Sequence, residues 1–155
     1  ECRERRPGPA FERVVEAATL LSGLGFESAG LAAAHAIHNG LAAIPATHTR
    51  LHGEKVAFGT LVQLMLESHA AGDAAGRTAA VAEARVCAEF FRRVGLPVTL
   101  ADLGIAAAER AVVIPQIAAR SVAAGETIHN MPFPVTAAAV ADAIEAADSF
   151  ATAPA

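Results

Sequence analysis

The hydrophobic pattern of this chain is helical from end to end. Apolar residues recur at intervals of three and four, as Val14, Ala18 and Leu21 do, and this is the spacing of one helix face. No segment alternates in the strand-like way, with β-branched residues, over more than a few positions. The pattern predicts helices over residues 9–22, 28–39, 52–71, 78–94, 106–124 and 136–150.

Helix start and stop signals set these boundaries. Gly23-Leu24-Gly25 is predicted to end the first helix, because glycine takes a left-handed C-terminal turn without strain. Ser28 is predicted to cap the second helix, and the pair Asn39-Gly40 to stop it. Thr99 and Asp102 have the spacing of a capping box around a short turn.

The predicted elements make an all-α fold. Pro115 is expected to kink the fifth helix, Thr136 to cap the last one, and residues 151–155 to fray. With 155 residues and no long linker or internal repeat, the chain is expected to form one helical domain over residues 1–155. Its antiparallel neighbours would be joined by short loops.

Composition narrows the class of protein. The hydrophobic fraction is 54% and the aromatic fraction 5%, so the core must be aliphatic. A net charge of −4 without a basic stripe argues against nucleic-acid binding, and the cluster from Arg3 to Arg6 is interpreted as a solvated end. No apolar run reaches the roughly 18 residues that span a bilayer. Neither nucleic acid nor a membrane is therefore expected as a partner.

The two cysteines and the first residues bear on the cellular compartment. Cys2 and Cys87 make no disulfide framework, and Cys87 is predicted to be a buried thiol. The first residues do not lead into an apolar segment of the secretory kind. A reducing, cytoplasmic setting is therefore expected. The chain begins without Met and is interpreted as processed, cropped or a fragment.

Three of the six histidines are candidate metal ligands. His35 and His38 lie three residues apart, on roughly one helix face, and neutral imidazole nitrogen is a good zinc ligand. The alternative is a pair of half-buried rings bonded to carbonyl groups. His52 is predicted at a helix N-terminus, where the positive end of the dipole keeps the ring neutral. The alternative there is a ring bonded to a backbone group.

The other histidines have a weaker context. His48 and His69 belong to no motif and are interpreted as surface residues. His129 lies in the predicted loop over residues 125–135, where it either borders a cleft or has a structural role.

Two stretches give the sequence its family resemblance: GFESAGLAAAHAIHNG over residues 25–40 and LHGEKVAFG over residues 51–59. With them, the chain from about Glu12 to Phe150 resembles the metal-binding half of the glycerol dehydrogenase branch of the iron-containing alcohol dehydrogenase family. The resemblance implies a helical bundle like the C-terminal domain of the dehydroquinate synthase-like and iron-containing alcohol dehydrogenase fold.

The resemblance also implies a site. In the family, one aspartate and two histidines hold a catalytic zinc, or iron in other branches, and the two histidines match His35 and His52. Phe26 matches an apolar residue that lines the substrate pocket, which His35 also borders, and His38 would lie near the site without being a ligand. The aspartate and the nucleotide-binding α/β domain precede the matched region and are absent from this chain. NAD would be bound mainly by that domain, and its contacts in this chain are unknown.

The implied activity is NAD-dependent oxidation of a secondary hydroxyl of glycerol or a related polyol or alcohol, by metal-assisted hydride transfer. The complete enzyme would be a homo-oligomer acting on a small polyol in glycerol metabolism, and the isolated chain is expected to be inactive. Imidazole ligands suit both zinc and iron. The alternative is a truncated, non-catalytic helical remnant or an interaction domain.

Overall fold

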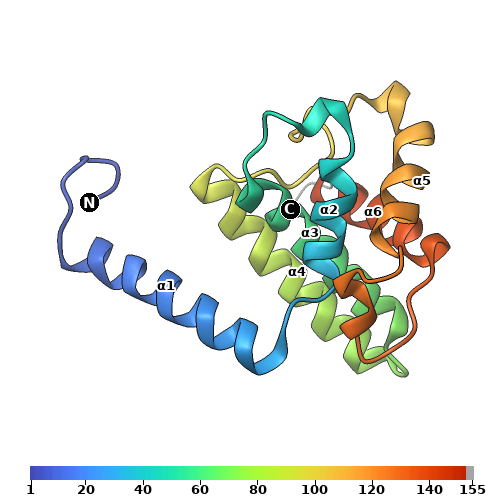
Figure 1. Ribbon diagram of the computed structural model, residues 1–155, viewed down its shortest axis with the longest axis horizontal. Coiled ribbons are helices and arrows are strands. Elements are labelled where there is room, and N and C mark those ends of the chain that lie inside the picture. Colours follow the sequence, from blue (N-terminus) through green and yellow to red (C-terminus); the bar gives the residue numbers. More distant parts are fainter. Residues whose placement is uncertain (153–155) are drawn as a thin grey trace. The chain divides into compact units, whose positions relative to one another are not determined.

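The computed structural model describes residues 1–152 and is helical throughout (Figure 1). The sequence predicts that residues 151–155 fray, and residues 153–155 of this segment lie outside the described residues. No strand occurs in residues 1–152, so the predicted all-α class is confirmed. The helices are α1 (Pro9–Ala29), α2 (Ala33–Ala42), α3 (His52–Ala70), α4 (Ala74–Val94), α5 (Arg110–Ser121) and α6 (Ala137–Thr152), with short 3₁₀ turns η1 (Pro45–Thr47), η2 (Ala107–Glu109) and η3 (Thr127–Asn130).

Contacts divide the chain into two compact units, Glu1–Leu31 and Ala32–Ala155, where the sequence suggested one domain. The first unit is essentially α1, whose N-terminus is capped by Glu1: its carboxylate accepts the Phe11 N–H at 2.6 Å. No residue within Pro9–Ala29 is buried. The exposed large apolar side chains of α1 are Phe11, Val14, Val15, Leu20, Leu21, Leu24 and Phe26.

The predicted end of the first helix at Gly23-Leu24-Gly25 is wrong. Both glycines lie inside α1, with nothing within 4 Å of the place where a Cβ atom would lie, and Ser28 belongs to the last turn of the same helix instead of capping the next. An isolated glycine costs a helix only about 1 kcal/mol relative to alanine, and the residues around it favour helix. The helix ends instead at Gly30, whose φ of 70° places it on the left-handed side.

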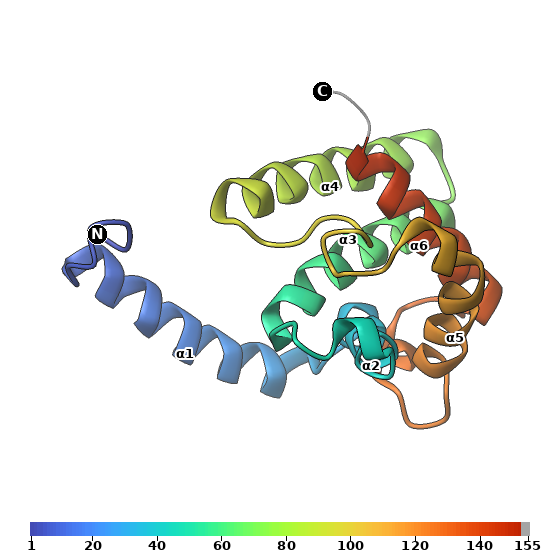
Figure 2. The ribbon, with the colours of Figure 1, turned by 90° about the horizontal axis from the view of Figure 1, so that it is seen from above.

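In the second unit α3 is the central helix. It packs against α2, α4 and α6, while α5 packs against α2 and α6. Figure 2 shows α3 between α4 on one side and α2 on the other. Phe58, Leu61 and Val62 of α3 are fully buried, because three neighbouring helices surround this stretch. The core that they join is aliphatic apart from Phe58, as the composition predicted.

Several predicted boundaries shift within this unit. Helix α2 continues past Asn39-Gly40 to Ala42, and α4 begins four residues before Thr78 because Asp73 caps it, accepting the Gly76 N–H at 2.7 Å. Helix α4 ends, as predicted, at a left-handed Gly95. The predicted fifth helix is divided into η2 and α5, and α5 continues through Pro115. The predicted loop over residues 125–135 contains η3.

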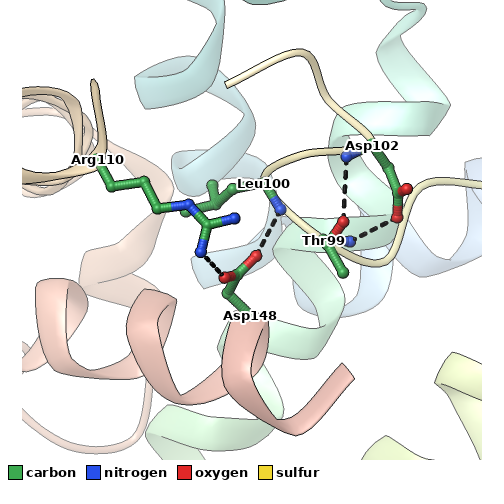
Figure 3. Close-up of polar contacts among 5 residues, drawn as sticks. All are labelled: Thr99, Leu100, Asp102, Arg110 and Asp148. Atoms are coloured by element: carbon green, nitrogen blue, oxygen red, sulfur yellow. Dashed lines mark hydrogen bonds and ion pairs between the residues drawn. The ribbon is translucent and has the colours of Figure 1, made fainter. Parts of the chain in front are cut away.

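The predicted capping box between Thr99 and Asp102 is confirmed (Figure 3). The Asp102 carboxylate accepts the N–H groups of Val98 and Thr99 at 3.1 and 3.0 Å, and the Asp102 N–H donates to the Thr99 hydroxyl at 3.0 Å. These bonds fix the loop that follows α4.

Asp148 of α6 ties this loop to α5 (Figure 3). Its carboxylate is buried, accepts the Leu100 N–H at 2.8 Å, and forms an ion pair with Arg110 at the start of α5. A buried carboxylate needs such partners, because leaving one unpaired costs several kcal/mol. Asp148 therefore joins three separate parts of the second unit.

Among the described residues, no single helix is both long enough and apolar enough to cross a membrane. Only α1 and α2 taken together, as a pair bent at the break between them, have the required length and apolar composition. Cys2 is exposed, and Cys87 is half-buried where the sequence predicted a buried thiol. Both cysteines are free.

Candidate metal centre

Three histidine rings from two helices meet on the surface of the second unit. His35 and His38 project from α2, and His52 is the first residue of α3. The ring centroids of His35 and His52 are 5.4 Å apart, and those of His38 and His52 are 4.3 Å apart. His52 is exposed, while His35 and His38 are half-buried. The structure therefore brings together three of the side chains that the sequence singled out.

The close approach of α2 and α3 places these rings. Gly59 of α3 lies so near the main chain of α2 that a Cβ atom would overlap the carbonyl oxygen of Ala34. Gln63 of α3 accepts the Ala34 N–H at 3.0 Å, and the Thr127 hydroxyl of η3 donates to the Ala32 carbonyl at 2.8 Å. These two bonds satisfy backbone groups at the start of α2, which has no side-chain cap of its own.

The start of α3 is also fixed. The Glu54 carboxylate accepts the Leu51 N–H at 2.6 Å, so a carboxylate lies in the first turn, where the helix dipole favours it. The neighbouring Lys55 is 7% exposed, which the sequence had not indicated. The Nδ1 atom of His52 lies 3.1 Å from Nε2 of His38, so this nitrogen faces another imidazole ring and not a backbone group.

Electrostatics favour the neutral form of the two half-buried rings. Burial lowers the pKa of His35, and the nearby His52 and His38 lower it further. Burial also lowers the pKa of His38; the hydrogen bond with Asn39 opposes this, while the charges of His52 and Lys55 add to it. A neutral ring keeps a lone pair, which is the form that binds a metal.

The separation of His35 and His52 fits a shared ion. Two imidazoles bound at about 2.0–2.1 Å to one tetrahedral ion have ring centroids roughly 5 Å apart, close to the 5.4 Å observed. Among residues 1–152, however, no group of three or more His, Cys, Asp or Glu side chains is placed to hold an ion. The described residues thus bring two imidazole rings within reach of one ion, without a third donor beside them.

A row of polar side chains that was not predicted from the sequence links this cluster to Arg120 at the end of α5. His38 Nδ1 lies 3.0 Å from Asn39 Oδ1, and the Asn39 amide lies 2.7 Å from a carboxylate oxygen of Glu126. The other Glu126 oxygen is 2.6 Å from Arg120. Asn39 had been interpreted only as a helix-stop residue. Since Glu126 is 87 residues away along the chain, no local pattern connects them.

The remaining predicted residues lie elsewhere. Phe26 belongs to the unit Glu1–Leu31, where its side chain is 63% exposed. It lies within α1, although the predicted helices over residues 9–22 and 28–39 left it between them. His48 and His69 are exposed, as predicted. His129 is within 3.2 Å of the Ala123 carbonyl, in keeping with the structural role that was one of its two interpretations.

A separate hollow of about 640 Å³ lies between the start of α3 and the loop after α4. Its lining residues are Arg50, Glu54, Arg92, Gly95, Leu96, Pro97, Val98, Thr99, Ala101 and Asp102. The three clustered histidines are not among them, so this hollow and the histidine cluster are different features of the surface.

Comparison with known proteins places these residues in context. Over 92% of its length the chain is 51% identical to a glycerol dehydrogenase of Escherichia coli O6:H1. It is also 48% identical, over 90% of its length, to a glycolaldehyde reductase of Halobacterium salinarum. It spans little more than a third of either relative, 36% and 35%. No family model matches.

A solved structure agrees with the sequence match. The chain superposes on the crystal structure of a probable glycerol dehydrogenase from Sinorhizobium meliloti with a TM-score of 0.83 and 45% identity. The superposition covers 96% of this chain and 39% of that one. The matched part is the C-terminal helical domain of such structures.

Proposed function

Because this chain is homologous to the C-terminal helical domain of glycerol dehydrogenases, we propose that it is the metal-binding part of an NAD-dependent polyol dehydrogenase. The observation that carries the proposal is the convergence of His35 and His52, brought from two helices to a ring separation of 5.4 Å. Sequence identity alone would not require this geometry. A helical remnant without a function has no need to hold two imidazole rings at such a distance.

In the proposed site, His35 and His52 bind Zn²⁺ or Fe²⁺ through neutral imidazole nitrogens. When bound, the ion supplies a Lewis acid that makes the substrate hydroxyl more acidic at neutral pH. The family resemblance assigns a third donor, an aspartate, to a region outside this chain. A carboxylate is also needed on chemical grounds, because two neutral ligands leave the charge of a dication unbalanced.

This chain's own residues orient and protect the donors. Burial lowers the pKa of His35, and the nearby His52 and His38 lower it further, which favours the neutral ring that keeps a lone pair. Gly59 and Gln63 hold α2 against α3 and thereby fix the distance between the rings. NAD, the hydride acceptor, would be bound mainly by an α/β domain outside this chain.

The substrate is proposed only as a class. One relative is called a glycerol dehydrogenase and another a glycolaldehyde reductase, and both are close to half identical to this chain. Glycerol and glycolaldehyde are small, hydroxylated two- or three-carbon compounds. We therefore assign a small polyol or hydroxyaldehyde as substrate.

Zinc binding by this chain tests the site directly. Calorimetric titration with Zn²⁺ should show weak binding to one site. His35→Ala or His52→Ala should lower the Zn²⁺ affinity by more than about 100-fold, because loss of a residue that only supports a metal ligand already costs about 10- to 100-fold. His48→Ala, at an exposed histidine outside the cluster, should leave binding unchanged. Equal affinity in all four proteins would disprove the metal site.

A chimera tests the activity. This chain would replace the matched C-terminal segment of the Escherichia coli glycerol dehydrogenase, and NADH formation from glycerol would be measured. Activity that is lost with His35→Ala and kept with His48→Ala supports the proposal. A folded chimera that binds zinc but forms no NADH would instead favour the non-catalytic remnant.

A further inference from the structure

The histidine cluster continues as a row of four side chains joined by hydrogen bonds and an ion pair, His38, Asn39, Glu126 and Arg120, here called the relay. We propose that the relay fixes the tautomer of His52, so that its Nε2 carries no proton and is free to bind a metal. The inference rests on the metal site proposed above and deepens it. The relay residues are positioning residues, because they act on the ion only through His52.

The ion pair at the Arg120 end of the relay fixes which groups donate and which accept. Arg120 is a permanent donor, and it lies 2.6 Å from one oxygen of Glu126, whose side chain is 8% exposed. A carboxylate paired in this way only accepts hydrogen bonds. The group 2.7 Å from its second oxygen must therefore donate, so Asn39 turns its amide nitrogen toward Glu126.

The orientation of Asn39 then sets the tautomer of His38. With its nitrogen facing Glu126, Asn39 presents its Oδ1 to His38 Nδ1 at 3.0 Å. A carbonyl oxygen only accepts, so Nδ1 of His38 carries the proton. In the neutral ring this leaves Nε2 of His38 without a proton and with a lone pair.

The tautomer of His38 in turn sets the tautomer of His52. Nε2 of His38 lies 3.1 Å from Nδ1 of His52 and, having no proton, can only accept. Nδ1 of His52 is therefore the donor, and the tautomer so defined has a lone pair on Nε2. This assignment reverses the usual preference, because a neutral histidine in water carries its proton mainly on Nε2. The relay thus does for His52 what a carboxylate or carbonyl partner does for many metal-bound histidines.

Nitrogen NMR of the metal-free chain tests the assignment without any metal. At about pH 8, where histidine is neutral, isotope-labelled rings should show His38 and His52 each with a proton on Nδ1 and none on Nε2. The two kinds of ring nitrogen differ widely in chemical shift, so the result is unambiguous. A proton on Nε2 of His52 in the unmodified chain would overturn the proposal.

Glu126→Gln provides a variant that should invert the relay. Arg120 will hold the amide oxygen introduced at position 126, so the new amide nitrogen faces Asn39 and donates to its oxygen. Asn39 must then turn its own nitrogen to His38, and both ring tautomers reverse. The expected results are a proton on Nε2 of His52 and a Zn²⁺ affinity lower by about 10- to 100-fold.

Glu145→Gln is the matched control, because it makes the same charge change at an exposed position of α6. It should leave both the ring tautomers and the Zn²⁺ affinity as they are. Unchanged tautomers in a folded Glu126→Gln chain would disprove the relay. If that variant does not fold, the NMR result on the unmodified chain still decides. If the unmodified chain shows the expected tautomers but binds no Zn²⁺, the metal site fails while the relay stands.

Discussion

At the scale of single residues, Gly59 controls the distance between the two helices that carry the histidines. A side chain at this position has no room, because its Cβ would overlap the backbone oxygen of Ala34. A backbone atom cannot rotate away as a flexible side chain can. The separation of α2 from α3 therefore depends on one residue that has no functional group.

We predict that Gly59→Ala destabilises the fold by about 1–3 kcal/mol, despite the better helix propensity of alanine, since α2 must move away from α3. Gly53→Ala, at a position of the same helix with nothing within 4 Å, should leave the stability unchanged or raise it by up to about 1 kcal/mol. Urea unfolding of both variants measures the difference. Equal stabilities would show that the two helices can separate at no cost.

Residues of the site were predictable from the sequence to different degrees. His35, His38 and His52 stood out because of residue type, spacing and the family resemblance, and the structure brings them together. Asn39 and Glu126 did not, because their bond joins residues 87 positions apart and depends on where η3 folds back. The role of His35 and His52 as ligands and of Phe26 as a pocket residue stays a prediction.

At the scale of elements, the loop after α4 is held by a carboxylate whose charge matters. Burial raises the pKa of Asp102, but the hydrogen bonds from the Thr99 hydroxyl and from the backbone of Val98 and Thr99, together with the Arg92 charge, outweigh it. The net effect is a pKa below the ordinary value. The charged form is therefore favoured in the folded protein.

We predict that Asp102→Asn lowers the free energy of unfolding by about 0.5–1 kcal/mol at neutral pH, the usual value of a cap. Since the pKa of Asp102 is lower in the folded than in the unfolded chain, its stabilisation is complete above about pH 4 and is lost as the pH falls through the folded value. The gap between parent and variant should therefore close on acidification. Urea unfolding across a pH series measures it, and a gap that widens toward low pH would contradict the assignment.

The spacing of apolar residues predicted which segments are helical better than it predicted where each helix begins and ends. His52 as the start of α3 and Gly95 as the end of α4 were predicted, because a family motif and a left-handed glycine mark them. The breaks at Gly23 and Asn39 were wrong because a local stop signal is only a preference, and favourable neighbours carry the helix past it. Which helices touch was not predictable, since that depends on close contacts such as Gly59 against Ala34.

At the scale of the whole molecule, the hydrophobic core belongs to the second unit. Every buried hydrophobic residue among those described lies at Ala33 or beyond, while α1 exposes a row of large apolar side chains. A helix face of this kind promotes association. The two units therefore contribute different properties, one the stability and the other the tendency to associate.

We predict that a chain without residues 1–31 unfolds within about 2 °C of the full chain, because the core is unchanged. Its concentration-dependent association should fall sharply, because the exposed apolar face of α1 is gone. Calorimetry and analytical ultracentrifugation measure the two properties. A large drop in the unfolding temperature would show that the second unit depends on α1.

The placement of the aromatic residues has a practical consequence. The chain has seven phenylalanines and no tryptophan or tyrosine. Phe11 and Phe26 lie exposed on α1, 40% and 63%, whereas Phe58 is completely buried on α3. Fluorinated phenylalanine, incorporated without any mutation, would thus give well-separated resonances for the two environments. Such spectra would follow the melting of the core and the mobility of the first helix independently, in one sample, where intrinsic fluorescence offers almost no signal.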